Sequence, residues 1–221
     1  MEKNYNKIVI EYIDKYLCDE PIFLEEIRNY VVHKTNIKNK KELDKVYANI
    51  NVIINRMNSE KKIKTYSKGI YYKPTNNILG EMPLDKTKII NKKYLKNNNG
   101  KINGYITGEK LFNQLGLTTQ IPNTTIIVTN NYNRKDDYKV EYLNIILRKS
   151  KIKITNENYQ YLQLIDILAN KDKINIENKK YKEAIYNEYI IKNKLDFEKI
   201  IKYARETKNK KILEKLFILA K

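Results

Sequence analysis

Apolar residues recur at helical spacing through the first sixty positions of the chain. This spacing predicts a first helix over Tyr5 to Leu17. A second helix is predicted from Pro21 to about Lys34, because proline suits the first turn of a helix. After the polar segment 35–40, the pattern predicts a third, longer helix. Its expected inward stripe consists of Leu43, Tyr47, Ile50, Ile54 and Met57.

Two short β-prone runs follow the third helix. Ile63 to Tyr66 and Ile70 to Lys73 flank the turn Ser67-Lys68-Gly69, which predicts a hairpin. Three helices and a hairpin are the layout of a winged helix-turn-helix, whose third helix enters the DNA major groove while the hairpin, the wing, contacts the backbone. We therefore expect residues 1–75 to form a DNA-binding domain.

The outward face of the third helix carries side chains that suit DNA. Asparagine can bond adenine through two hydrogen bonds, arginine bonds guanine, and lysines pair with phosphates. The expected DNA-binding residues are Lys41, Lys45, Asn49 and Arg56 on the helix, with Lys61, Lys62, Lys64 and Lys68 in or before the wing. A solvated helix face in a protein-interaction module is the alternative interpretation.

The remainder of the chain predicts a linker and a second domain. Residues 76–103 are expected to be a linker with one short helix, Asp85 to Leu95, because the flanking stretches are polar and turn-forming. Residues 104–221 are expected to form an α/β domain that ends in helices. The expected fold class is therefore α+β: an N-terminal winged helix-turn-helix followed by a mixed α/β domain with C-terminal helices.

The second domain is expected to centre on residues 104–130, GYITGEKLFNQLGLTTQIPNTTIIVTN. We expect a strand, a helix starting at Gly108 with Thr107 as its N-cap, a stop at Gly116, and a second strand. The segment does not match a phosphate-binding loop, because only three residues separate Gly104 from Gly108 and Leu111 follows Lys110. Its glycines are expected to let the helix pack closely on the sheet.

A further strand is expected over Val140 to Leu147, as the second arm of a hairpin after the 133–137 turn. Metal-dependent nucleases gather carboxylates and a lysine around a metal ion, and this region contains Asp136, Asp137, Glu141 and Lys149. A charged hairpin loop is the simpler interpretation of these residues. We expect no catalytic residue, metal or cofactor, and no enzyme. Helices are predicted over 157–169, 180–192, 197–208, with Asp196 as a cap, and 210–219.

The charge of the chain favours a polyanion as partner. The net charge is +18. Positions 1–78 contain 15 basic and 10 acidic residues, and positions 79–221 contain 29 basic and 16 acidic residues. A strongly basic protein favours nucleic acid or an acidic protein partner.

Cys18 and His33 are the only residues of their types, which excludes an internal disulfide and paired-histidine catalysis. The polar start and short apolar runs predict a cytoplasmic protein with no membrane contact.

Three segments resemble the AbiEi-like antitoxin family of type IV toxin-antitoxin systems. They are KGIYYKP at 68–74, the block at 104–130, and YLQLIDIL at 161–168, with Lys68 where the family usually has arginine. The resemblance implies a winged helix that binds operator DNA and represses its own operon. It also implies a second domain that counteracts a nucleotidyltransferase-like toxin, directly or indirectly, in phage defence by abortive infection.

The sequence leaves two alternative functions open. One is an enzyme that acts on nucleic acid or on the toxin by phosphoryl transfer. The other is an RNA-binding module, suggested by the basic second domain. The oligomeric state is not specified by the sequence.

Overall fold

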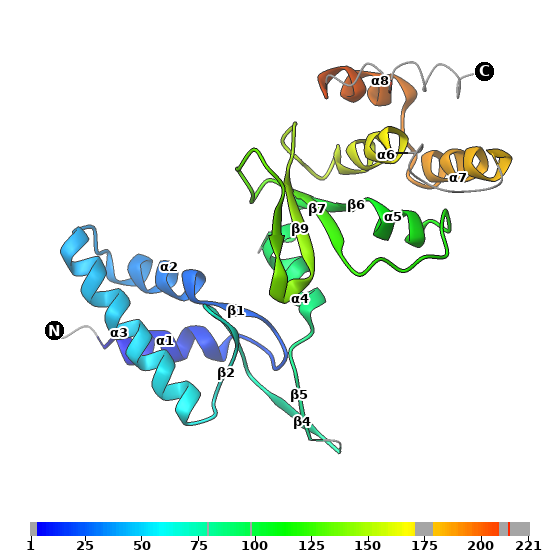
Figure 1. Cartoon of the computed structure of the whole chain (residues 1–221). Coiled ribbons are helices and arrows are strands. Elements are labelled where there is room, and N and C mark those ends of the chain that lie inside the picture. Colours follow the sequence, from blue (N-terminus) through cyan, green and yellow to red (C-terminus); the bar gives the residue numbers. More distant parts are fainter. Residues whose placement is uncertain (1–3, 79, 98, 171–178, 208–211, 213–221) are drawn as a thin grey trace. The chain divides into compact units, whose positions relative to one another are not determined.

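The computed structural model describes residues 4–78, 80–97, 99–170, 179–207 and 212. The chain divides into two compact units, residues 1–89 and 90–221 (Figure 1). Helices and strands occur in both, so the α+β class is confirmed. No helix in the described ranges is long and apolar enough to cross a membrane.

The first unit begins with three helices and a small sheet, shown in blue and cyan in Figure 1. Its elements are α1 (Tyr5–Asp14), β1 (Ile22–Phe23), α2 (Leu24–Thr35), α3 (Lys40–Ser59), β2 (Lys64–Ser67) and β3 (Ile70–Tyr72). The strands form an antiparallel sheet in the order β1-β3-β2. The predicted helices and hairpin are therefore present.

The three helices pack around one apolar core. Helix α3 buries Val46, Ile50, Ile53, Ile54 and Met57, whereas Leu43 and Tyr47 of the predicted stripe are only half-buried. The Asn39 side chain caps the helix by accepting a hydrogen bond from the Lys41 backbone N–H at 2.9 Å. The remaining core residues come mainly from the other two helices and from β1: Val9, Ile13, Ile22, Ile27, Val31, Ile37 and Ile63.

The predicted start of the second helix at Pro21 is wrong, because Ile22 and Phe23 form the strand β1. They pair with Tyr71 and Ile70 of β3, and both side chains are buried. Helix α2 begins only at Leu24, whose backbone N–H donates to the Gly69 carbonyl at 2.9 Å. The pairing partner lies almost fifty residues away, so local spacing does not reveal this strand.

Residues 76–83, predicted as a connector, contain part of a second hairpin. Strands β4 (Thr75–Asn77) and β5 (Gly80–Met82) are antiparallel. The hairpin is attached by the Thr75 hydroxyl, which donates to Asp19 at 2.7 Å, and by an ion pair between Glu81 and Lys64. The predicted helix over 85–95 is present as α4 (Lys86–Ile90), which continues into the π-helical turn η1 (Asn91–Leu95).

The second unit is a four-stranded sheet with helices packed on it. Its elements are β6 (Gly104–Thr107), α5 (Glu109–Gln114), β7 (Thr125–Thr129), β8 (Tyr138–Val140), the 3-10 turn η2 (Glu141–Leu143), β9 (Ile145–Lys149), α6 (Tyr159–Ala169), α7 (Lys179–Lys192) and α8 (Phe197–Glu206). The strand order is β6-β7-β9-β8. Helix α6 packs on β6, and α8 packs on α6.

The strand predicted over Val140 to Leu147 is two strands, and the predicted hairpin with the preceding strand is wrong. The turn η2 and Asn144, whose φ is 53°, separate β8 from β9. Strand β9 then pairs in parallel with β7, and β8 lies at the edge, antiparallel to β9. The apolar side chains of β9, Ile145 and Leu147, are buried, which favours the inner position.

The turn before α5 also differs from the prediction. Thr107 is the last residue of β6, paired with Ile126, and Gly108 is the N-cap with φ 70°. The stop at Gly116 is confirmed by its φ of 71°. The helices predicted over 157–169, 180–192 and 197–208 are present, and the Asp196 side chain caps α8. The helix predicted over 210–219 lies outside the described residues, except for residue 212.

Candidate nucleic-acid interface

The outward face of α3 is polar and basic. Lys41, Lys45 and Asn49 are exposed at four-residue intervals, so they lie on one face of the helix. Ala48 and Val52 are exposed beside them, and Val52 is 67% exposed. This surface offers cations for phosphates, an amide for hydrogen bonding and apolar groups for contact with a methyl.

Arg56, the fourth predicted residue on α3, is held by the protein itself. Its Nη2 donates to the Asn6 side-chain oxygen at 2.5 Å, and its Nε lies 4.0 Å from the Glu60 carboxylate. These contacts tie the guanidinium to the start of α1. Arg56 therefore contributes positive charge to this end of α3, with part of its guanidinium engaged by Asn6.

A shallow hollow runs between the start of α1 and the middle of α3. Asn4, Tyr5 and Asn6 line one side, and Lys45, Asn49 and Val52 line the other. The sequence prediction did not include the α1 residues, because only the tertiary packing of α1 against α3 brings them to this surface. The amides of Asn4 and Asn6 extend the polar surface around Asn49.

The lysines before and in the β2–β3 hairpin divide into two groups. Lys62 forms an ion pair with Glu60 at 2.7 Å, and Lys64 forms one with Glu81. The hydrogen bond from Lys62 lowers the pKa of Glu60. Lys61 and Lys68 are exposed and, like Lys41 and Lys45, form no ion pair with any described residue. They are therefore the lysines of this hairpin that are available for phosphate contacts.

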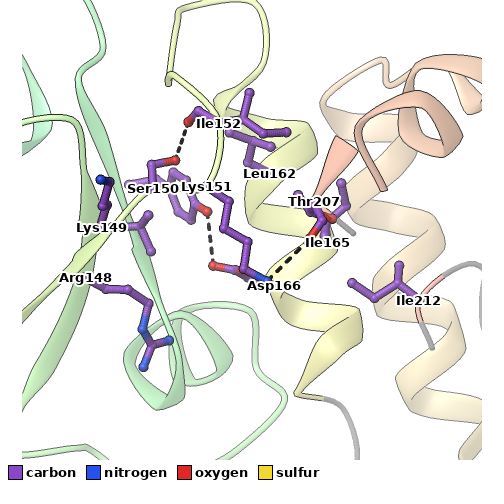
Figure 2. Close-up of a pocket in the computed structure, with 12 residues that line it drawn as sticks. Arg148, Lys149, Ser150, Lys151, Ile152, Leu162, Ile165, Asp166, Thr207 and Ile212 are labelled. Atoms are coloured by element: carbon purple, nitrogen blue, oxygen red, sulfur yellow. Dashed lines mark hydrogen bonds between the residues drawn. The ribbon is translucent and has the colours of Figure 1, made fainter. Parts of the chain in front are cut away.

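A second polar cluster lies in the second unit, between the sheet and α6 (Figure 2). The register places Tyr105 of β6, Val128 of β7 and Arg148 of β9 in one row across the sheet. The Tyr105 hydroxyl donates to the Asp166 carboxylate of α6 at 3.1 Å. Together with residues 149–152, these side chains line a small pocket.

The polar groups of this pocket are bonded to one another or to residues beside the pocket. Arg148 forms a bidentate hydrogen bond with the Asp137 carboxylate, with Nη2 donating at 2.6 Å and Nε at 3.0 Å. The Lys151 ammonium donates to the Thr207 carbonyl at 3.5 Å (Figure 2). Burial raises the pKa of Asp166, while the Tyr105 hydrogen bond and the Arg148 charge act in the opposite direction. We interpret the cluster as a polar connection that fixes α6 to the sheet.

Changing Asp166 to Asn should alter how stability depends on pH. The folded-state pKa of Asp166 lies above the unfolded value of about 3.9. At pH values between these two pKa values, the folded state binds more protons than the unfolded state. The free energy of unfolding therefore falls as the pH rises through this range. The Asp166→Asn variant should lose this decrease, because Asn can still accept from Tyr105 but does not ionise.

Urea denaturation between pH 4 and pH 8 would measure the effect. Asp136→Asn is the control, because Asp136 is exposed and accepts the Tyr132 hydroxyl through its backbone oxygen, which the substitution keeps. A wild-type pH profile in the Asp166→Asn variant would contradict the assignment.

The acidic residues with nuclease-like character do not gather around one point. Asp137 is paired with Arg148, and Glu141 is paired with Lys139 at 2.8 Å. Lys149 lines the small pocket between the sheet and α6. Among the residues with a described position, no group of three or more histidine, cysteine, aspartate or glutamate residues could hold a metal ion.

Comparison with known proteins finds a match to one protein family. No curated protein matches the chain. The model of a family of unknown function, DUF6088, matches residues 44–200, which include most of α3, the β2–β3 hairpin and the sheet and α6 of the second unit. Since the match covers more than half of the chain, the protein belongs to this family of unknown function, DUF6088.

Proposed function

We propose that the protein is a DNA-binding repressor that also serves as the antitoxin of a type IV-like toxin-antitoxin system. The observation that carries the DNA-binding part is the exposed face of α3, where Lys41, Lys45 and Asn49 stand in one row. The antitoxin part rests on the resemblance of residues 68–74, 104–130 and 161–168 to the AbiEi-like family.

The order of elements in the first unit supports a winged helix-turn-helix. Helices α1, α2 and α3 are followed by the β2–β3 hairpin, and β1 completes a three-stranded sheet. In winged helix-turn-helix domains the third helix lies in the major groove, and the hairpin follows the neighbouring backbone. Here α3 has 20 residues and is about 30 Å long, so it can extend along the groove and beyond it.

The contacts of the individual side chains support different roles for the predicted residues. Lys41 and Lys45, which are exposed and not ion-paired within the described ranges, would bind phosphates. Asn49 would bond an adenine edge, and Val52 would contact a thymine methyl. Lys68, at the tip of the β2–β3 turn, would bind the flanking backbone. Lys62 and Lys64 are neutralised by glutamates and would contribute less.

Substitutions of Asn49 and Lys68 should separate base recognition from backbone binding. Asn49→Ala should weaken binding to the protein's own upstream DNA about tenfold and leave binding to random DNA nearly unchanged, because it removes a base contact. Lys68→Ala should weaken both by a similar factor, because phosphates carry no sequence information. Fluorescence anisotropy with both duplexes at about 0.15 M salt would measure this.

Asn58→Ala is the matched control for Asn49→Ala, since Asn58 is also exposed on α3 but lies near its end. No preference of the wild-type protein for its upstream DNA would contradict the repressor proposal. The antitoxin proposal has a separate test: co-expression with the protein encoded next to it should restore growth that the neighbour inhibits, and failure to do so would contradict it.

A further inference from the structure

A small cavity lies where the two parallel strands of the second unit end. Strands β7 and β9 run in the same direction and finish side by side, with Thr129 paired to Lys149. The cavity has a volume of about 110 Å³, and its described lining comes from the segments 129–133 and 149–153. In α/β sheets, ligands bind outside the carboxyl ends of the strands, where the loops that leave them surround one space. We call this space the strand-end cavity.

The neutral polar side chains of the lining fix the two loops to each other. The Asn130 amide donates to the Ile154 carbonyl at 2.9 Å, and its side-chain oxygen accepts from the Ile154 backbone N–H at 2.9 Å. The Thr129 hydroxyl donates to the Tyr94 carbonyl at 2.8 Å. The hydrogen-bonding groups of these side chains are therefore already used within the protein, and the walls of the cavity are held in place.

The two lysines of the lining, Lys149 and Lys153, have no such partners. Both are exposed, and neither forms an ion pair or a side-chain hydrogen bond with a residue of described position. Lys151 differs, because its ammonium donates to the Thr207 carbonyl, and Figure 2 shows Lys149 on the far side from Thr207. None of the described lining residues is aspartate or glutamate. The strand-end cavity therefore carries two positive charges without a counter-charge from the described part of the chain.

We propose that the strand-end cavity binds a dianionic phosphate, either inorganic phosphate or the phosphate monoester of a small molecule. A phosphate monoester carries a charge of about −1.5 to −2 at pH 7, which two lysines balance. Each backbone phosphate of a nucleic acid carries a single negative charge and needs only one. The volume equals that of roughly four water molecules at about 30 Å³ each, which accommodates one tetrahedral oxyanion.

The residues of the two loops would divide the contacts with this phosphate. Lys149 and Lys153 would donate to its oxygens from the loop after β9, through charge-assisted hydrogen bonds. Asn133, on the loop after β7, is exposed and its amide forms no hydrogen bond with a described residue, so it can donate as well. The site lies on the second unit and uses none of the residues assigned to duplex DNA.

NMR titration of the isotope-labelled full chain with inorganic phosphate, and separately with adenosine monophosphate, tests the proposal. Sodium chloride at about 0.15 M in every sample screens non-specific charge contacts. Saturable shifts are expected at the backbone amides of residues 130–133 and 149–153. The double variant Lys149→Ala, Lys153→Ala should weaken binding about tenfold or more, because two charge-assisted hydrogen bonds are lost. The ligand that saturates at the lower concentration identifies the source of the phosphate.

The matched control is the double variant Lys192→Ala, Lys199→Ala, which removes the same charge from exposed positions of the second unit and should bind normally. Lys149→Gln with Lys153→Gln replaces the alanine pair if the amide spectrum of that variant shows unfolding. Lowering the pH from about 7.5 to about 5 should weaken binding of adenosine monophosphate, because the monoester loses one charge below its second pKa of about 6.

The proposal is overturned if phosphate shifts amides across the lysine-rich surface without saturating at the two loops. It is also overturned if the control variant loses as much affinity as the Lys149, Lys153 variants, or if added chloride at equal ionic strength produces the same shifts. Tighter binding at these amides by an oligonucleotide that lacks terminal phosphates would contradict the assignment to a dianion.

Discussion

Replacing Gly104 with alanine is expected to lower the stability of the second unit by about 3 kcal/mol, through overpacking. A Cβ atom at this position would lie 2.3 Å from the Tyr94 carbonyl oxygen and 2.8 Å from the Val128 carbonyl oxygen. Both are backbone atoms, of the η1 turn and of β7, so no side chain can rotate away. Strand β6, strand β7 or the η1 turn would have to move.

The control for Gly104→Ala is Gly100→Ala. Gly100 has φ 73°, and an added Cβ would meet no heavy atom within 4 Å. Alanine there introduces only the backbone strain of a left-handed residue, about 1 kcal/mol. Urea denaturation followed by circular dichroism would give both free energies. A Gly104→Ala protein at least as stable as the Gly100→Ala protein would show that β6 and η1 do not pack as closely as described.

The double variant Lys41→Ala, Lys45→Ala should bind the protein's own upstream DNA more than about tenfold more weakly, with a salt dependence reduced by roughly two phosphate contacts. Both lysines are exposed on the same face of α3 and form no ion pair with the described residues. Their charge is therefore available to DNA. Anisotropy measurements between about 0.05 and 0.2 M salt give the affinity and the slope.

The matched control is the double variant Lys192→Ala, Lys199→Ala. It removes the same charge from exposed positions in the second unit. If the DNA binding seen with the wild type came only from net charge, the two double variants would behave alike. Equal losses would therefore contradict the assignment of α3 as the DNA-binding helix, and a loss confined to the α3 variant would support it.

Arg56 shows that a residue type alone does not reveal the partners of a side chain within the folded protein. Its place on the outward face of α3 suggested a guanine contact, because arginine pairs well with that base. In the folded chain its guanidinium is bonded to Asn6, fifty residues earlier, and lies near Glu60. Lys64 is similar, since its partner Glu81 comes from the β4–β5 hairpin. The spacing of charged residues did not reveal either partner.

Features that depend on neighbouring residues were predictable from the sequence. The apolar spacing predicts α1, α3, α6 and α8, because one face of each helix must be buried. The β2–β3 hairpin and the stop at Gly116 follow from local turn chemistry. The exposed row of Lys41, Lys45 and Asn49 on α3 was predictable for the same reason.

The pairing of distant segments depends on the packing of the whole unit and could not be predicted from local patterns. The strand β1 exists because β3 lies beside it, and β9 pairs in parallel with β7 because its buried side chains need an inner position in the sheet. The same holds for the hydrogen bond between Tyr105 and Asp166 and for the stacking of Tyr138 on Tyr132. Periodicity shows which face of a segment is apolar, but a strand partner or the partner of a buried polar side chain is selected by the free energy of the whole packed unit.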